Sequence, residues 1–248
     1  MRPYETKLVA AEPQLEAMTS LSEGALRPTA AAAGKIGAIK DAKAAFAEGK
    51  RLRALNDPAQ MTNALYAYLR VLQLDPLNSA ARLERGKILQ FDVGAPRLQL
   101  ALYNYSAALR LAPGNWAAYR YRATAWNAIR FFPAAEADDT AALVWKKDFA
   151  PLYMERAENI MAQGREDDAD LAMGKKLDPK GYDAMRKSID RDLESFRRQI
   201  AAEKAAAAEW AQIWASMARA DHQARMGRAN AADASGNHDL ARVIREGG

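Results

Sequence analysis

The chain of 248 residues has no cysteine and only two histidines, His222 and His238. Without cysteine it has no disulfide, no thiolate nucleophile and no cysteine metal site. The histidines are far apart in the sequence and no cluster of carboxylates surrounds either of them, so neither has a partner at metal-ligand spacing. We therefore expect a protein that is not an enzyme and that has no catalytic residues, metal or cofactor.

Long apolar runs are also missing. Residues 1–15 contain charges and prolines where a signal peptide needs an apolar segment. Nowhere does the chain approach the roughly 20 consecutive apolar residues of a membrane span. We expect no transmembrane segment and a cytoplasmic location, or a periplasmic or envelope-associated one if the N-terminus has been processed.

Alanine, by contrast, is abundant and supplies much of the hydrophobic half of the sequence. It favours helix more than any other residue, which predicts closely packed helices. The formal net charge of +5 is moderately basic. It is compatible with an acidic partner, an anionic membrane surface or nucleic acid, and it selects none of them.

The sequence contains internal repeats. Residues 48–78 align with residues 85–115 without a gap, and the pattern continues more weakly to about residue 180. Each unit is predicted to form two helices, because apolar residues recur every three or four positions between turn signals. The turns are Asn56-Asp57-Pro58, Gly94-Ala95-Pro96, Pro133 and Gly164, and the prolines that close second helices are Pro76, Pro113 and Pro179. No alternating strand pattern is present, so the sequence predicts an all-α fold.

The second helices carry the residues that identify the repeat. Ala64 and Tyr68, and again Ala101 and Tyr105, stand at helical spacing ahead of a closing proline. In this the chain resembles the tetratricopeptide repeat (TPR) family. The matching residues of the first helices are Gly86, Tyr119, Trp126 and Tyr153.

The resemblance implies a right-handed α-solenoid of TPR-like helix hairpins, with about four helix pairs. In such an array the small residues Gly86, Ala123 and Ala157 let paired helices approach closely, opposite the tyrosines of the second helices. Two residues depart from the pattern: Asp139 stands where an aromatic is expected, and Lys147 replaces a closing proline.

Four segments are expected along the chain. Residues 1–35 form a loose N-terminal segment and residues 36–182 the repeat array. Residues 183–226 contain no internal proline or glycine and are predicted to form one long helix, which caps the array, associates with a partner, or does both. Residues 227–248 are small and polar and are predicted to be a mobile tail.

Family geometry places partner binding in a concave groove lined by first-helix residues. The groove residues that it implies here are Lys43, Phe46, Lys50, Arg53, Leu83, Lys87, Gln90, Arg120, Thr124, Asn127, Met154, Glu158 and Met161. One end of this set is basic, which suits an acidic peptide or helix. An ordinary solvated face is the equally weighted alternative.

Three arginines, Arg85, Arg122 and Arg156, recur at equivalent places in the repeat. They either bind carboxylates of a partner or form ion pairs with acidic residues of their own units. Asp138 and Asp170 fall where a second helix can face Arg122 and Arg156, and an arginine inside a helical array is rarely left unpaired. This favours the structural interpretation.

Trp210, Trp214 and Met217 continue an apolar stripe along the long helix. Such a stripe is typical of a packed core, or of a surface for self-association or a partner helix. For residues 203–220 we favour association, either of the chain with itself as a homo-oligomer or with a partner helix.

The function that these residues favour is a protein–protein interaction scaffold or adaptor. One alternative is a bacterial envelope assembly factor that resembles the pilotin-type proteins of pilus and secretion machines. Another is a nucleic-acid-binding helical repeat protein, since Arg and Tyr interleave near residue 120. Nucleic acid is disfavoured, because these aromatics already follow the repeat period.

Overall fold

Ten α-helices make up almost all of the structure, a computed structural model that describes residues 28–92, 97–234, 242 and 245. No strand occurs in those residues, so the predicted all-α class is confirmed. The chain divides into two compact units, Met1–Asp190 and Arg191–Gly248.

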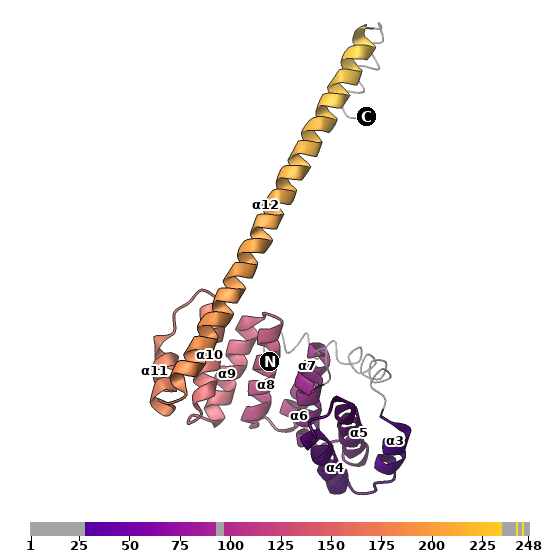
Figure 1. The fold of residues 1–248 in the computed structure, drawn as a ribbon, viewed down its shortest axis with the longest axis vertical. Coiled ribbons are helices and arrows are strands. Elements are labelled where there is room, and N and C mark those ends of the chain that lie inside the picture. Colours follow the sequence, from indigo (N-terminus) through magenta and orange to yellow (C-terminus); the bar gives the residue numbers. More distant parts are fainter. Residues whose placement is uncertain (1–27, 93–96, 235–241, 243–244, 246–248) are drawn as a thin grey trace. The chain divides into compact units, whose positions relative to one another are not determined.

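Within the first unit the helices pack as sequential antiparallel pairs, α4 with α5, α6 with α7, α8 with α9 and α10 with α11 (Figure 1). A shorter helix, α3 (Ala30–Gly37), packs on α5. The first helices of the pairs are α4 (Ala42–Ala54), α6 (Ser79–Lys87), α8 (Trp116–Ala128) and α10 (Ala150–Ala162). The second helices are α5 (Pro58–Leu74), α7 (Leu98–Leu111), α9 (Phe132–Trp145) and α11 (Asp168–Leu177). A π-helical turn, η1 (Ile88–Asp92), extends α6.

Short polar side chains begin many of these helices. Asp41 Oδ2 accepts a hydrogen bond of 2.8 Å from the amide of Ala44, and Asn78 and Asn115 cap α6 and α8 in the same way. Such caps satisfy amides that have no partner inside the helix. The helices α5, α7 and α11 end at leucines just before the closing prolines, as the sequence predicts.

The tight turns inside the pairs need left-handed backbone. Asn56 (φ 51°), Arg130 (φ 60°) and Gly164 (φ 77°) connect α4 to α5, α8 to α9 and α10 to α11. Asparagine and glycine tolerate this region well. The predicted turns at Asn56 and Gly164 are therefore confirmed, whereas residues 93–96, with the turn at Gly94, lie outside the described part of the chain.

The last helix, α12 (Tyr182–Ala234), begins in the first unit and continues through the second. The prediction of one long C-terminal helix is confirmed, but the helix passes through Gly227 and ends eight residues later than residue 226, where we expected it to stop. A single glycine inside a helix costs about 1 kcal/mol relative to alanine, and the alanines that follow favour continuation. Of the expected tail, residues 235–241, 243–244 and 246–248 lie outside the described part, as do residues 1–27 of the N-terminal segment.

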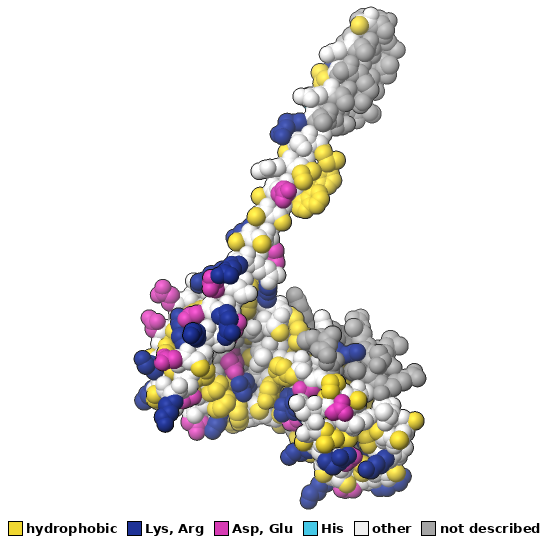
Figure 2. Space-filling view, in the orientation of Figure 1, with side chains coloured by type: hydrophobic (Ala, Val, Ile, Leu, Met, Phe, Trp, Pro, Cys, Tyr) yellow, Lys and Arg dark blue, Asp and Glu magenta, His cyan; other side chains and the backbone are white. Residues whose placement is uncertain are grey.

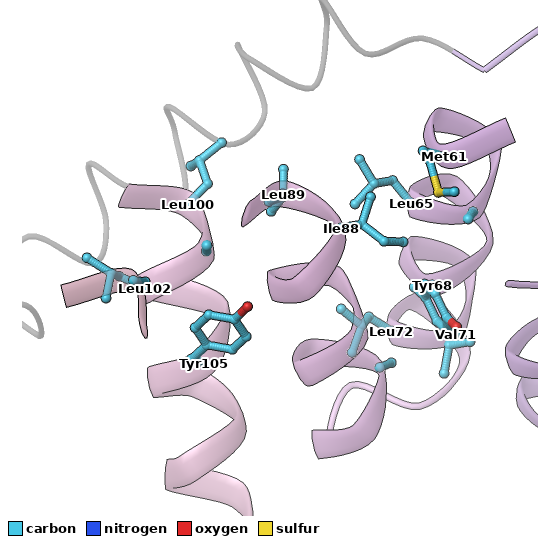
Figure 3. Packing of buried hydrophobic residues seen from close by; sticks show 14 of the residues in the cluster. Met61, Leu65, Tyr68, Val71, Leu72, Ile88, Leu89, Leu100, Leu102 and Tyr105 are labelled. Carbon is cyan, nitrogen blue, oxygen red and sulfur yellow. The ribbon is translucent and has the colours of Figure 1, made fainter. Parts of the chain in front are cut away.

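Close approach at glycine organises the core of the first unit. Tyr68 and Tyr105 are fully buried, and each ring covers a glycine of the preceding helix, Gly49 and Gly86. Figure 3 shows both rings among the leucines and isoleucine that fill the space between helices. A Cβ atom on Gly49 would lie 2.9 Å from the ring of Tyr68, and one on Gly86 would overlap the ring of Tyr105.

Gly86→Ala should therefore destabilise the protein by about 1–3 kcal/mol, since the added Cβ atom would overlap the fully buried ring of Tyr105. Urea unfolding followed by circular dichroism measures the change. Gly34→Ala in α3 is the control, because a Cβ atom there meets nothing within 4 Å. Equal effects of the two substitutions would contradict the packing argument.

Candidate functional site

Ion pairs engage two basic residues, Arg53 and Lys87, in the N-terminal half of the predicted groove. Arg53 of α4 donates to Glu84 of α6 at 2.7 Å and to Asp92 of η1 at 2.8 Å. Lys87 lies 2.8 Å from the same glutamate and 5.1 Å from the centre of the Tyr121 ring. Of the basic residues predicted here, Lys43 and Lys50 remain on the exposed surface.

Two residues of the predicted groove are core residues instead. Gln90 is buried and accepts a 2.8 Å hydrogen bond from the hydroxyl of Tyr105. It turns inward because α6 gives way to a π-helical turn, where the spacing of an α-helix no longer holds. Met154 is buried against Gly174 of α11, so it packs α10 on α11.

Phe46, Leu83 and Met161 are half-buried. Phe46 contacts Tyr68 edge-on at a centroid distance of 5.3 Å, and Leu83 packs against the core. Met161 Sδ lies 3.8 Å from a guanidinium nitrogen of Arg186, near the start of α12. These three side chains mainly support the packing of the first unit.

The C-terminal half of the predicted groove contains a pocket of about 270 Å³. It lies among three consecutive helices, α8, α9 and α10. The residues that line it are Thr124, Asn127, Asp139, Glu155, Glu158 and Asn159. Thr124, Asn127 and Glu158 belong to the predicted set, whereas sequence reasoning missed Glu155 and Asn159 and noted Asp139 only as a departure from the repeat.

A chain of amide hydrogen bonds joins the three helices at this pocket. The Asn127 amide nitrogen donates to Asn159 Oδ1 at 2.7 Å and lies 3.4 Å from Glu158 Oε1. Asn159 in turn donates to Asp139 Oδ2 at 2.8 Å. The chain links the walls of the pocket, and the amide of Asn159 is engaged through both its oxygen and its nitrogen.

Asp139 is the most unusual group in this site. Its side chain is fully buried, and its Oδ1 atom has no hydrogen-bond partner. Burial raises the pKa of Asp139 well above its ordinary value, and the charges of Glu155 and Asp138 act in the same direction. The hydrogen bond from Asn159 and the charge of Arg156 oppose this change in pKa and do not cancel it.

Arg120 is bound to one of the residues that line the pocket. Its guanidinium binds Glu155 with Nε–Oε2 at 2.9 Å and lies 5.1 Å from the centre of the Phe149 ring. The Thr124 hydroxyl donates to the carbonyl oxygen of Arg120 at 3.0 Å. The charge of Arg120 is thus already matched by a carboxylate and is not offered to an acidic ligand.

Two of the three arginines at equivalent places in the repeat, Arg122 and Arg156, pair with carboxylates inside their own units, as the structural interpretation predicts. Arg122 makes two bonds to Asp138, at 2.7 and 2.8 Å, with both side chains buried. Arg156 binds Asp170 in the same way, at 2.6 and 2.7 Å. Burial lowers the pKa of Arg85 to about 10. None of the three is an exposed residue of the surface.

The second unit presents the predicted apolar stripe on its surface. Trp210, Trp214 and Met217 are 62%, 65% and 56% exposed, and Ile213, which sequence reasoning did not include, is 39% exposed. Figure 2 shows hydrophobic side chains gathered on α12 at this level. So large an exposed apolar group on one helix is typical of an interaction surface.

Comparisons with known proteins do not assign the chain to a family. No family model matches the chain, and no curated protein matches it. In the described residues no three histidine or acidic side chains are grouped so that they could hold a metal ion, and no helix there is long and apolar enough to cross a membrane. His222 is exposed on α12, and His238 falls outside the described residues.

Arg122→Met should cost about 3–5 kcal/mol, because it leaves the buried carboxylate of Asp138 without its counter-ion. Arg120→Met is the matched control, two residues away in the same helix, where the pair with Glu155 is partly exposed. That pair should contribute about 0–1 kcal/mol. Denaturant unfolding of both variants measures the difference, and similar losses would refute the distinction.

Asp139→Asn should stabilise the protein at pH 8 and much less at pH 4. Because the pKa of Asp139 is raised in the folded state, the folded protein holds this proton more tightly, and stability is lost as pH rises above the unfolded pKa. Asparagine does not ionise, so it avoids this loss of stability, which is on the order of 1 kcal/mol or more. Its side-chain oxygen can still accept the hydrogen bond from Asn159. Thermal unfolding at the two pH values tests this; a gain that does not change with pH would contradict it.

Proposed function

We propose that the chain is a non-catalytic interaction protein of the tetratricopeptide-repeat type, a right-handed α-solenoid that serves as a scaffold or adaptor. The proposal is supported by the sequential antiparallel pairs and by the glycine–tyrosine contacts that recur at equivalent places in the first two pairs. Helix pairs of this kind bury their apolar faces against their neighbours and leave an extended surface for a partner.

The observation that carries the proposal is the pocket among α8, α9 and α10. It collects polar side chains from the two first helices, α8 and α10, on which the family binds its partners, and hydrogen bonds already hold them in place. A preorganised polar pocket of this size suits one or two side chains of an extended peptide or helix.

The charge of the binding surface differs from the expectation of an acidic partner. Arg53, Lys87 and Arg120 are each paired with carboxylates, and the lining of the pocket contains three carboxyl groups and no cation. Among the basic residues of the predicted groove, Lys43 and Lys50 are the two that are exposed and could bind an acidic partner. We propose that the partner segment presents hydrogen-bond donors to the pocket.

Thr124→Arg tests this function, because an arginine side chain at Thr124 would fill the pocket. Ala172→Arg, on the exposed surface of α11, is a control that adds the same charge. An affinity pull-down from extracts of the source cell, with mass spectrometry, should recover a protein that binds the intact chain and the control but not the Thr124 variant. Recovery of the same proteins with all three would place the binding site elsewhere.

A second surface, the stripe of Trp210, Ile213, Trp214 and Met217, is proposed to mediate self-association. Replacing Trp210 and Trp214 with glutamine should convert a homo-oligomer to monomer in sedimentation velocity. The control replaces Ala205 and Ala208 with glutamine, since helical geometry puts these residues on the opposite face from Trp210. A wild-type chain that already sediments as a monomer would rule out self-association.

The other candidate functions receive less support. The interleaved arginines and tyrosines near residue 120 are engaged inside the protein: Arg120 binds Glu155, Arg122 binds Asp138, and Tyr121 stacks on Tyr105 at 6.1 Å. These contacts leave little for nucleic acid to bind. An envelope assembly factor of the pilotin type remains compatible with the adaptor proposal, as one setting in which such a protein works.

A further inference from the structure

The pocket exists where the repeat departs from its pattern. In the alignment of the repeats, Asp139 occupies the place of Tyr68 and Tyr105, whose rings are fully buried between helices. Aspartate is much shorter than tyrosine and has a carboxyl group in place of the ring. This carboxyl group belongs to a residue that lines the polar pocket of the third pair.

That carboxyl group is not fully satisfied by the protein. Asp139 Oδ2 accepts from Asn159, but the buried Oδ1 atom has no partner. A buried acceptor without a hydrogen bond costs about 1–3 kcal/mol, and such groups are rare in folded proteins. A ligand that brings a donor to Oδ1 would recover this free energy.

The charges around the pocket determine whether a cationic or an anionic ligand is favoured. Glu155 and Glu158 line it together with Asp139, and no lysine or arginine is among the lining residues. The arginines near the pocket already form ion pairs, Arg120 with Glu155 and Arg156 with Asp170. An anionic ligand would therefore meet repulsion, whereas a cation would be attracted from two helices at once.

The shape of the site favours an ammonium group. The acceptors come from different helices, with Thr124 on α8, Asp139 on α9 and Glu158 on α10, and so they do not form the flat pair that a guanidinium prefers. An ammonium group has three donors and acts as a compact point charge. A metal ion is less suited, because these acids are not grouped as metal ligands in the part of the chain that the structure describes.

We propose that this pocket binds the ammonium group of a lysine side chain in the partner segment, with Asp139 Oδ1 as its principal acceptor. The inference rests on the proposed function and names the chemistry that its pocket recognises. Asp139 then has the role of a specificity determinant.

Binding should be linked to the ionisation of Asp139. In the empty pocket, burial, Glu155 of α10 and Asp138 of α9 raise the pKa of Asp139, against the opposing effects of Asn159 and Arg156. A bound ammonium stabilises the carboxylate, so binding releases a proton whenever Asp139 is protonated in the free protein. The affinity should therefore rise with pH until the pKa of the free pocket is passed.

The test is a nitrogen-15 NMR titration of the full chain at pH 8 with N-acetyl-lysine-methylamide. Amide signals of α8, α9 and α10 near the pocket should shift on titration. The norleucine analogue, which has the same apolar chain without the ammonium, should leave them unmoved. Equal shifts with both compounds would overturn the proposal.

Two variants make the assignment specific. Asp139→Asn should weaken lysine binding by about tenfold or more, since it removes the charge-assisted hydrogen bond. Asp168→Asn is the matched control, with the same chemical change at an exposed residue of α11, and should bind as the wild type does. Unchanged binding by the Asp139 variant would overturn the proposal.

A third probe, spermidine, separates a peptide lysine from a free polyamine. Tight binding of spermidine with no response to the lysine derivative would overturn the lysine assignment in favour of a small-molecule amine. The proposed function has its own readout: a partner that the Thr124→Arg variant loses, while the lysine derivative shifts no signal, would leave the adaptor standing and refute the lysine site alone.

Discussion

The close approach of paired helices is the constraint on which the rest of the first unit depends. Gly49 and Gly86 have no side chain, and the rings of Tyr68 and Tyr105 occupy the space above them. The next pair contributes to the packing around each ring: Ile88 belongs to the same buried cluster as Tyr68, and Tyr121 stacks on Tyr105. Stability is therefore shared between neighbouring pairs.

Charged groups are arranged by the same packing. Inside the pairs, Arg122 and Asp138 are buried together, where the attraction between them must offset the cost of removing both from water. Between the pairs, Arg53 and Arg120 reach carboxylates of the next first helix. The surface that the first helices share thus becomes far less basic than the overall charge of the chain suggests.

Asp139 departs from the repeat at a place where the structure has a pocket. The aspartate keeps the backbone geometry of the unit and removes the ring that elsewhere fills the interior. Folding the pair then places a carboxyl group in a dry environment beside Glu155, which accounts for its raised pKa. At this position a carboxyl group that a ligand can bind stands in place of a ring that packs helices together. Such departures from ideal packing are common at binding sites.

The sequence by itself determined the helices, their turns at residues such as Asn56 and Gly164, and the pairing of Gly86 with Tyr105. These depend on spacing along one chain and on local backbone preference, which are readable from residue order. Only the tertiary structure decided that Gln90 turns inward, that Arg120 pairs with Glu155, and that a pocket opens at Asp139. Each of these depends on how a helix is rotated and what its neighbour presents, and residue order does not encode that rotation directly.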